Sequence, residues 1–285
     1  MAIDYDRLIA RPLPTIQQTY RAKDTMLYAL GLGLGGNPLD PRELAFVYED
    51  GLKIFPTMPQ ILGYPGFWAQ EADTGIDWRK LVHGEQSFVL HKALPAEGKI
   101  VAKNRVSALY DKGEGKGAVL CQERLVYDAD TEELLVTVQQ VSLLRGDGGF
   151  GGPSGSPPLA HTIPERSPDA SLDLSTPPQL ALIYRLSGDA NPLHADPAVA
   201  KGAGFERPIL HGMATMGIAC HALLRAVLDY RSEQIGGMRV RFSAPFLPGE
   251  TLRTEIWKDG DVLSFRAWAV ERNALVLNNG RIELI

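Results

Sequence analysis

The feature that most constrains the fold of this chain is a stretch dense in glycine, proline and serine near its middle. Residues 145–178 read RGDGGFGGPSGSPPLAHTIPERSPDASLDLSTPP. Proline lacks a backbone donor and glycine carries excess backbone entropy, so this composition disfavours a regular helix or a central strand. We therefore predict an N-terminal domain over residues 1–145, a linker over 146–177 and a C-terminal domain over 178–285. A total of 285 residues agrees with two domains of roughly 150 residues each.

The two halves show the same order of predicted elements. In the first half, an apolar helical segment over residues 23–34 precedes strand-like runs at 86–91, 99–110, 118–128 and 134–144. In the second half, a helical segment over 211–230 precedes runs at 237–244, 251–258, 262–271 and 274–283. Apolar and charged residues alternate in Met238-Arg239-Val240-Arg241-Phe242, as in a half-buried strand. A helix followed by antiparallel strands predicts an α+β fold in each half.

A weak internal repeat supports duplication. Tyr-Ala-Leu at residue 28 is followed by GGNPLD at 35–40, and Tyr-Arg-Leu at 184 is followed by DANPLH at 189–194. Two matches in the same order indicate related halves. The second copy has Asp189 and His194 where the first has Gly35 and Asp40, so the repeat assigns an acid–base pair to the C-terminal half alone.

Composition and charge exclude several classes of protein. With 29 Lys and Arg against 34 Asp and Glu, the net charge is 29 − 34 = −5, which disfavours a nucleic-acid partner. Cys121 and Cys220 are too few and too far apart for a disulfide framework or a metal-site spacing. The first residues do not resemble a secretory signal, and the chain has no run of about 18 apolar residues to span a membrane. The last three residues are not a peroxisomal address, so we expect a cytoplasmic protein.

Asp189 and His194 are the first candidate catalytic pair. Gly188 and Pro192 disfavour a helix between them, so a tight loop can direct both side chains to one point. A carboxylate and an imidazole that share a water can remove and deliver protons near neutral pH. Asn191 could orient either partner. The alternative interpretation is an Asx turn, in which Asp189 and Asn191 cap a short helix and His194 only packs.

Gly212 is a candidate for polarising a carbonyl group. It lies in Pro208-Ile209-Leu210-His211-Gly212, at the start of the long apolar helix. Backbone amides in the first turn of a helix have no intrahelical partner and suit an oxyanion hole. The alternative is ordinary close packing at the start of a helix. The helix is apolar nearly all round, which predicts that it is buried.

These motifs carry a family resemblance. YRLSGDANPLH at 184–194, followed by PILHG at 208–212, resembles the hydratase motif of MaoC-like (R)-specific enoyl-CoA hydratases. The whole chain is similar to the two-part hydratase 2 unit of peroxisomal multifunctional enzyme type 2. Segments 46–49, 81–86, 111–113, 148–152 and 241–245 also fit that form, so the likeness covers nearly the full length.

The resemblance implies a double hot dog fold and a set of site residues. In this fold two antiparallel sheets each wrap on a helix, and the N-terminal half, which lacks the pair, supplies space for the acyl chain. Asp189 and His194 would hold and activate water, Asn191 would support them, and the Gly212 amide would bind the thioester oxygen. The positions expected to line the acyl-CoA site are His83, Gly84, Lys112 and Phe242.

The activity implied is the reversible addition of water to trans-2-enoyl-CoA, which gives (3R)-3-hydroxyacyl-CoA. No metal or other cofactor is expected, and coenzyme A counts as part of the substrate. We also expect a homodimer. Two alternatives remain from the sequence. One is a hot dog thioesterase acting on the same substrates, and the other is a non-catalytic acyl-CoA binding protein.

Overall fold

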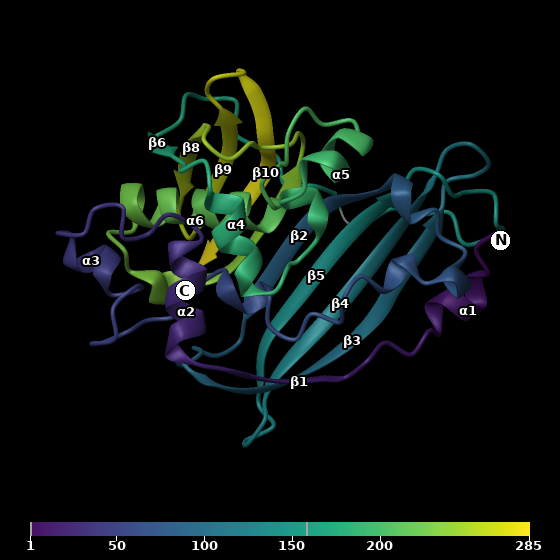
Figure 1. The fold of residues 1–285 in the computed structure, drawn as a ribbon, viewed down its shortest axis with the longest axis horizontal. Coiled ribbons are helices and arrows are strands. Elements are labelled where there is room, and N and C mark those ends of the chain that lie inside the picture. The colour runs from purple at the N-terminus through teal and green to yellow at the C-terminus, as the bar shows by residue number, and fades with distance from the viewer. Residues whose placement is uncertain (1, 158) are drawn as a thin grey trace. The chain divides into compact units, whose positions relative to one another are not determined.

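A computed structural model describes residues 2–157 and 159–285, and its backbone contacts divide the chain into two compact units. Unit 1 comprises residues 1–18, 62–92 and 99–160, and unit 2 comprises 19–61, 93–98 and 161–285. Figure 1 shows the elements along the chain. Because residues 19–61 group with the C-terminal half, the compact units differ in composition from the domains predicted around the glycine- and proline-rich stretch.

The strands of unit 1 have the order β1-β3-β4-β5-β2, and β3–β4, β4–β5 and β5–β2 pair antiparallel. The pairing is regular along most of its length, with β4 pairing both β3 and β5. One register shift lies between His83 and Glu85 of β2, at Gly84, where a bulge breaks the pairing with β5. The strands are β1 (Ile16–Tyr20), β2 (Leu81–Leu90), β3 (Gly98–Asp111), β4 (Ala118–Asp128) and β5 (Leu134–Leu144).

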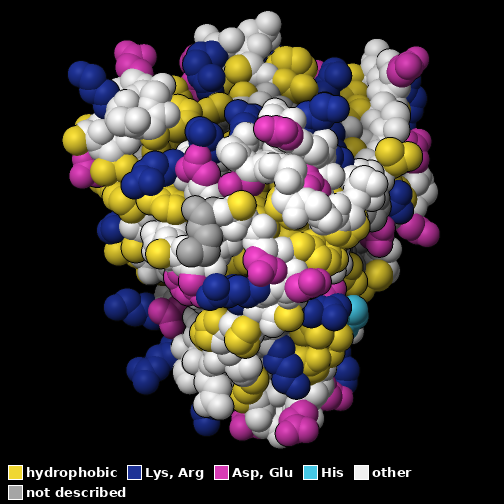
Figure 2. Space-filling view, turned by 90° about the vertical axis from the view of Figure 1, so that its right-hand side faces the viewer, with side chains coloured by type: hydrophobic (Ala, Val, Ile, Leu, Met, Phe, Trp, Pro, Cys, Tyr) yellow, Lys and Arg dark blue, Asp and Glu magenta, His cyan; other side chains and the backbone are white. Residues whose placement is uncertain are grey.

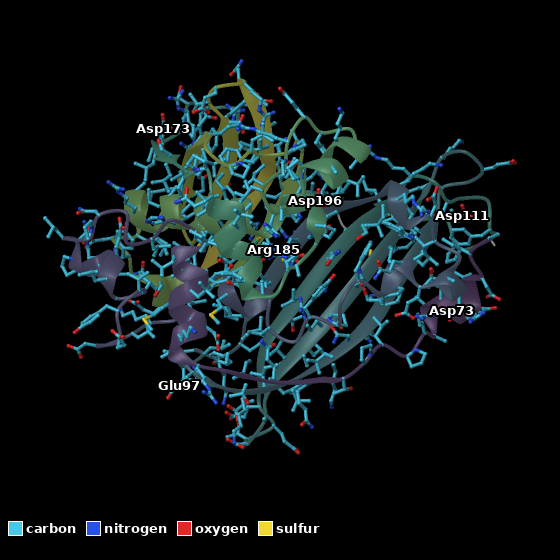
Figure 3. The ribbon with its side chains drawn as sticks, in the orientation of Figure 1. Asp73, Glu97, Asp111, Asp173, Arg185 and Asp196 are labelled. Carbon is cyan, nitrogen blue, oxygen red and sulfur yellow. The ribbon has the colours of Figure 1, made fainter. Side chains whose placement is uncertain are left out.

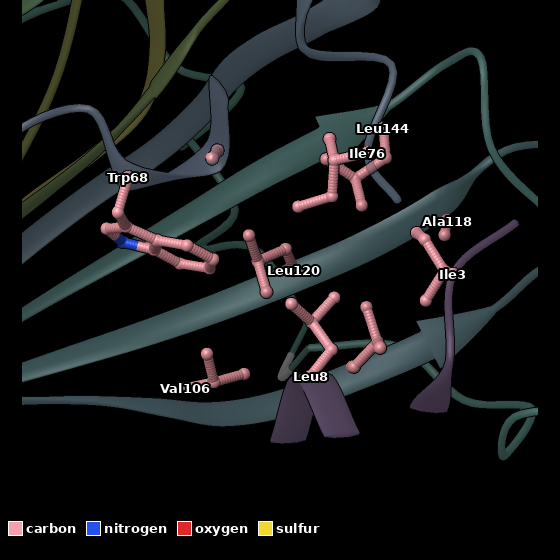
Figure 4. Packing of buried hydrophobic residues seen from close by; sticks show 10 residues of the cluster. Ile3, Leu8, Trp68, Ile76, Val106, Ala118, Leu120 and Leu144 are labelled. Carbon is pink, nitrogen blue, oxygen red and sulfur yellow. The ribbon is translucent and has the colours of Figure 1, made fainter. Parts of the chain in front are cut away.

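The core of unit 1 lies on one face of this sheet. Leu120 of β4 and Val106 of β3 are buried there against Trp68, and Leu8 of the first helix covers them (Figure 4). The segments that cover the face are short because turn residues interrupt them: α1 (Tyr5–Ile9) and the 3-10 helices η2 (Trp68–Gln70), η3 (Ala72–Thr74) and η4 (Trp78–Lys80).

The first part of the predicted linker is held in place by one carboxylate. Asp111, at the end of β3, accepts hydrogen bonds from the backbone amides of Gly113, Gly149 and Gly151, each at 2.8 Å. These amides stabilise the charged form and hold the pKa of Asp111 below its ordinary value. The glycines allow this turn, since Gly149 and Gly151 have φ angles of 78° and 83°.

The sheet of unit 2 has the order β7-β10-β9-β8-β6, and each neighbouring pair of strands in it is antiparallel. Buried and less buried residues alternate along β8, which fits a sheet with one face on the core. The strands are β6 (Ala170–Ser175), β7 (Ile235–Phe242), β8 (Thr251–Asp259), β9 (Val262–Ala269) and β10 (Ala274–Leu284). The strand β6 lies inside the segment 146–177 that composition predicts as a linker. It forms there because its backbone pairs with β8 along the edge of the sheet.

The core helix of unit 2 is α6 (Gly212–Val227), which contacts β6 and β8. Every residue from Ala214 to Leu224 is buried, so the prediction of a buried helix is confirmed. At Gly217 a Cβ atom would lie 2.6 Å from Leu32 Cδ2. The glycine therefore allows the segment after α2 to approach the helix closely.

The helical segment of the N-terminal half belongs to unit 2. This helix, α2 (Ala22–Leu30), contacts α4 (Leu180–Tyr184) and the 3-10 helix η5 (Arg185–Ser187), and the rings of Tyr28 and Tyr184 are 5.7 Å apart. The other short elements of unit 2 are α3 (Pro41–Leu44), α5 (Pro197–Gly202), η1 (Met58–Gln60), η6 (Pro192–His194) and η7 (Ser232–Gln234).

The face of the molecule in Figure 2 carries both kinds of charge. Lys and Arg side chains are interspersed there with Asp and Glu and with hydrophobic side chains. Exposed ion pairs also occur in unit 2, such as Arg253–Asp173 at 2.7 Å. In the described part of the chain, no helix combines the length and apolarity that crossing a membrane requires.

Candidate active site

The loop that carries the predicted pair runs between two short helices of unit 2. Figure 3 labels Arg185 at the end of α4 and Asp196 at the start of α5, and the loop lies between them. It begins at Gly188, whose φ of 125° disfavours any other residue. Asp196 then caps α5 by accepting a hydrogen bond from the amide of Ala198 at 2.7 Å. The loop is thus closed at both ends by its own sequence.

Within the loop, Asx hydrogen bonds fix the backbone. Asp189 Oδ1 accepts from the amide of Asn191 at 3.2 Å, and Asn191 Oδ1 accepts from the amide of Leu193 at 3.0 Å. The second bond caps η6, which begins with Pro192 and ends at His194. The Asx turn that the sequence offered as an alternative is therefore present. The turn is compatible with a site, because the Asp189 carboxylate and the His194 ring also lie close together.

His194 is buried, and its ring is fixed by a backbone carbonyl. Its Nδ1 donates to the carbonyl of Ile209 at 2.9 Å. A neutral imidazole carries one proton, so Nε2 keeps a lone pair. Burial lowers the pKa of His194 below its ordinary value and outweighs the opposing effects of the Ile209 carbonyl and Asp189. The ring is thus a neutral base near pH 7.

His211, the residue before Gly212, completes the site. Its Nε2 donates to the backbone carbonyl of Asp189 at 3.1 Å, and its ring stacks on that of His194 with centroids 3.8 Å apart. Burial, and then the neighbouring His194, lower the pKa of His211. In the described residues its Nδ1 is buried without a hydrogen-bond partner. On the other side the ring of Tyr184 lies 4.9 Å from it.

The three polar side chains converge. One donor atom each of Asp189, His194 and His211 lies within 4.8 Å of the other two. Asp189 is half-buried while both histidines are buried, so the cluster has one side nearer to solvent. A carboxylate oxygen and an imidazole lone pair at this separation can hold one water between them and exchange protons with it.

Gly212 is the first residue of α6, and no side chain caps this helix. Its amide lies in the first turn, where no intrahelical acceptor exists. The ring of Phe242, at the end of β7, packs against it, because a Cβ on Gly212 would lie 3.1 Å from Phe242 Cε1. The amide and this ring therefore lie next to His211 at the same helix start.

The remaining predicted residues lie in unit 1. His83 and Gly84 form the bulge of β2, and His83 Nε2 shares a hydrogen bond with Gln86 Oε1 at 3.1 Å. Lys112 is exposed after β3 and donates to the carbonyl of Gly155 at 2.7 Å. Their predicted role in lining the acyl-CoA site stays a prediction.

Sequence reasoning missed the part played by His211. It treated this residue only as part of the motif around Gly212, although a histidine directly before a helix start was a usable signal. It also missed Gln60, which is buried and whose Nε2 donates to the Met213 carbonyl in the first turn of α6 at 3.4 Å. No local pattern announces that contact, since 153 positions separate the two residues.

Comparison with known proteins identifies the family of the chain. A model of the MaoC like domain matches residues 160–279, and a model of the MFE-2 hydratase 2 N-terminal domain matches residues 18–146. The chain is 37% identical over 297 residues to enoyl-CoA hydratase ChsH3 of Mycobacterium tuberculosis, with 100% of this chain and 99% of that protein covered. The chain belongs to the MaoC-like dehydratase family. The family predicted from the motifs at 184–194 and 208–212 is thereby confirmed.

Solved structures of this family share the fold. A MaoC-like dehydratase from Phytophthora capsici superposes with a TM-score of 0.87 at 31% identity, covering 99% of this chain and 98% of that one. A Mycobacterium tuberculosis protein described as a double hotdog fold superposes with a TM-score of 0.58 at 17% identity, covering 99% and 98%. The predicted α+β double hot dog is confirmed by these neighbours.

Proposed function

We propose that this MaoC-like protein adds water to the double bond of a trans-2-enoyl-CoA thioester and forms the (3R)-3-hydroxyacyl-CoA. The observation that carries the proposal is the convergence of Asp189 and His194, with the imidazole lone pair of His194 left free by the Ile209 carbonyl. The similarity to the Mycobacterium tuberculosis enoyl-CoA hydratase ChsH3 supports the same chemistry.

In the proposed reaction the pair holds the attacking water. The hydroxyl group bonds to C3, C2 receives a proton, and the double bond between them becomes single. The proton lost by the water and the proton gained by C2 both pass through Asp189 and His194. The pair thus returns to its starting state and titrates as one coupled unit. Asn191 supports the pair by capping η6, which presents His194.

Gly212 is proposed to bind the thioester oxygen. Addition at C3 moves electrons toward this oxygen, and a backbone amide at a helix N-terminus stabilises the developing negative charge. The charge exists only on the way to the product, so the amide accelerates the reaction more than it strengthens binding. Phe242 packs against Gly212 and so limits the directions from which the thioester oxygen can approach the amide.

The test of this function is a paired assay with a short trans-2-enoyl-CoA. We expect loss of the enoyl absorbance without release of free thiol, and a 3R product on chiral analysis. Thiol release would assign the protein to the thioesterases instead. Absence of both changes would leave an acyl-CoA binding protein, and either result would reject the proposal.

Replacing Gly212 by alanine tests the thioester contact. The new Cβ would lie 3.1 Å from the Phe242 ring and beside the amide, so the oxygen cannot approach as closely. We expect the hydration rate to fall by up to about 10²-fold, the lower bound for complete loss of one oxyanion donor. Gly202→Ala at the end of α5 is the matched control, because its Cβ meets no atom within 4 Å. Equal rates in the two variants would contradict a role for Gly212.

The remaining assignments are proposals of the same kind. The N-terminal domain, residues 1–145, would provide space for the acyl chain and has no acid–base pair, while His83, Gly84 and Lys112 would line the substrate site. The proposed hydration leaves no electrons to be carried away, so it needs no redox cofactor. We also propose a homodimer in the cytoplasm, which size-exclusion chromatography and cell fractionation can test.

A further inference from the structure

We propose that His211 is a positioning residue for the Asp189–His194 pair, and that it holds each member of the pair through a separate contact. The kinetic consequence rests on the proposed hydratase function, whereas the contacts do not. All three residues belong to unit 2. The proposed proton transfers involve Asp189 and His194 only, so His211 has no part in them.

The first contact holds the backbone of Asp189. His211 Nε2 donates to the Asp189 carbonyl at 3.1 Å, and Asp189 Oδ1 accepts from the Asn191 amide at 3.2 Å. The preceding residue, Gly188, allows the backbone more conformations than any other residue would, so the position of Asp189 depends on such contacts. A residue anchored both at its carbonyl and at one carboxylate oxygen keeps its second carboxylate oxygen near one position.

The second contact holds the ring of His194. The imidazole rings of His194 and His211 stack, with centroids 3.8 Å apart and planes inclined by 28°. The Ile209 carbonyl holds one edge of the His194 ring through Nδ1 at 2.9 Å, and His211 covers one face. A ring restrained at an edge and on a face can direct its Nε2 lone pair only within a narrow range.

His211 can hold these groups because its own position is fixed. It is the N-cap residue of α6, and its carbonyl accepts from the amide and from Oγ1 of Thr215, at 3.0 and 3.1 Å. The residue before it, Leu210, donates its amide to the Phe246 carbonyl at 2.8 Å. His211 is thus fixed by the helix on one side and by the loop between β7 and β8 on the other.

The charges around His211 favour positioning over direct proton transfer. Burial is the largest cause that lowers its pKa, to about 4, and His194 and Arg185 also lower it while Asp189 opposes them. Two stacked imidazoles resist carrying two positive charges, so a proton taken up by His194 leaves His211 neutral. The single proton of the neutral His211 ring lies on Nε2, where the Asp189 carbonyl accepts it. His211 therefore keeps the same donor in both states of the pair.

The kinetic test compares two replacements of His211. Phenylalanine keeps a ring against His194 but has no donor for the Asp189 carbonyl, whereas the amide of glutamine can place a donor near the position of Nε2. We expect His211→Phe to lower kcat by about 10–10²-fold with KM unchanged, because a misplacement of about 1 Å at the reacting groups can cost about 10²-fold. His211→Gln should recover most of this loss.

His221→Phe is the matched control. It removes another buried imidazole of α6, which shares a hydrogen bond with the Tyr230 hydroxyl at 3.0 Å and lies about 15 Å farther along the helix axis. This variant should keep the wild-type kcat. Thermal unfolding shows which variants fold, and His211→Asn, whose amide is too short to reach the Asp189 carbonyl, replaces His211→Phe if that variant does not.

A second test needs no activity and follows the ring of His194 by NMR titration, with its signal assigned from its absence in His194→Gln. Asp189 favours the charged form of His194, against the larger effect of burial, so Asp189→Asn should lower the pKa of His194. If His211 holds Asp189 in place, this lowering should be smaller in the His211→Phe background. In the His211→Gln background it should have its wild-type size.

Three results would overturn the proposal. The first is a wild-type kcat in His211→Phe, and the second is a His211→Gln variant as slow as His211→Phe, because the ring would then act in the chemistry itself. The third is an equal lowering of the His194 pKa by Asp189→Asn in all three backgrounds. If the wild-type protein hydrates no enoyl-CoA, the proposed function fails, whereas the titration still decides whether His211 positions the pair.

Discussion

Asp189→Asn and His194→Gln are each expected to lower the hydration rate by about 10²–10⁴-fold, the usual contribution of a positioned acid or base. Asparagine keeps the size of Asp189 and can still accept the hydrogen bond from the Asn191 amide, so the loop should remain folded. It can no longer exchange a proton with the water. His194→Gln removes the imidazole. Its Nε2 lone pair, which is free because Nδ1 donates to the Ile209 carbonyl, is then lost as a base.

Asp196→Asn is the matched control for the loss of charge. Asp196 lies in the same loop and caps α5, where asparagine caps equally well. We expect this variant to keep the wild-type rate. Steady-state rates and thermal unfolding of all three variants check the prediction. A wild-type rate in Asp189→Asn or His194→Gln, with the fold intact, would contradict the role assigned to that residue.

Acidification from pH 7 to pH 5 is expected to destabilise unit 2 by about 4 kcal/mol. Burial lowers the pKa of His211 and of His221 to about 4, against about 6.5 in the unfolded chain. Between these two pKa values the unfolded state binds protons that the folded state does not. The free energy of unfolding therefore decreases as the pH is lowered. Each histidine contributes about 2 kcal/mol over this range.

The neighbours of each ring agree with this direction. The stacked His194 and the nearby Arg185 oppose a charge on His211, while Asp189 favours it less strongly than burial disfavours it. Around His221, Arg225 opposes the charge and Glu43 favours it, and burial is again the largest cause. His194, whose pKa is also lowered by burial, adds to the effect.

Urea unfolding at pH 8, 7, 6 and 5 measures this dependence. The stability should be constant between pH 8 and 7, where these rings are neutral in both states, and should fall below about pH 6.5. In His211→Phe the loss of unfolding free energy between pH 7 and pH 5 should be smaller by the contribution of one histidine, roughly 2 kcal/mol. If the urea concentration at the midpoint of unfolding stays the same or rises between pH 7 and pH 5, the rings are not buried in the neutral form.

Most regular elements of the fold could be predicted from periodicity. Each strand-like run predicted between residues 86 and 144 and between 237 and 283 corresponds to a strand, and both predicted helices exist. The strand β6 was missed because its composition resembles the linker around it, and it is stabilised by pairing with β8 at the sheet edge. Likewise, nothing local in residues 22–30 shows that this helix contacts α4 of the other half.

The candidate site also has features that the local sequence predicts and features that depend on tertiary packing. The convergence of Asp189 and His194 follows from glycine, proline and Asx turns within six residues, all of which are local features. The tautomer of His194 depends on the Ile209 carbonyl, and the stacking of His211 depends on the path of the chain between the loop and α6. Contacts of this kind come from tertiary packing, so spacing alone could not identify them.

The most direct test of the central claim is a double-mutant cycle on the hydration rate. If Asp189 and His194 act on one water as a unit, the variant that carries both Asp189→Asn and His194→Gln should be no more than about 10-fold slower than the slower single variant. If the double variant instead shows the product of the two single losses, the residues act independently, and the shared-water account of this site is wrong.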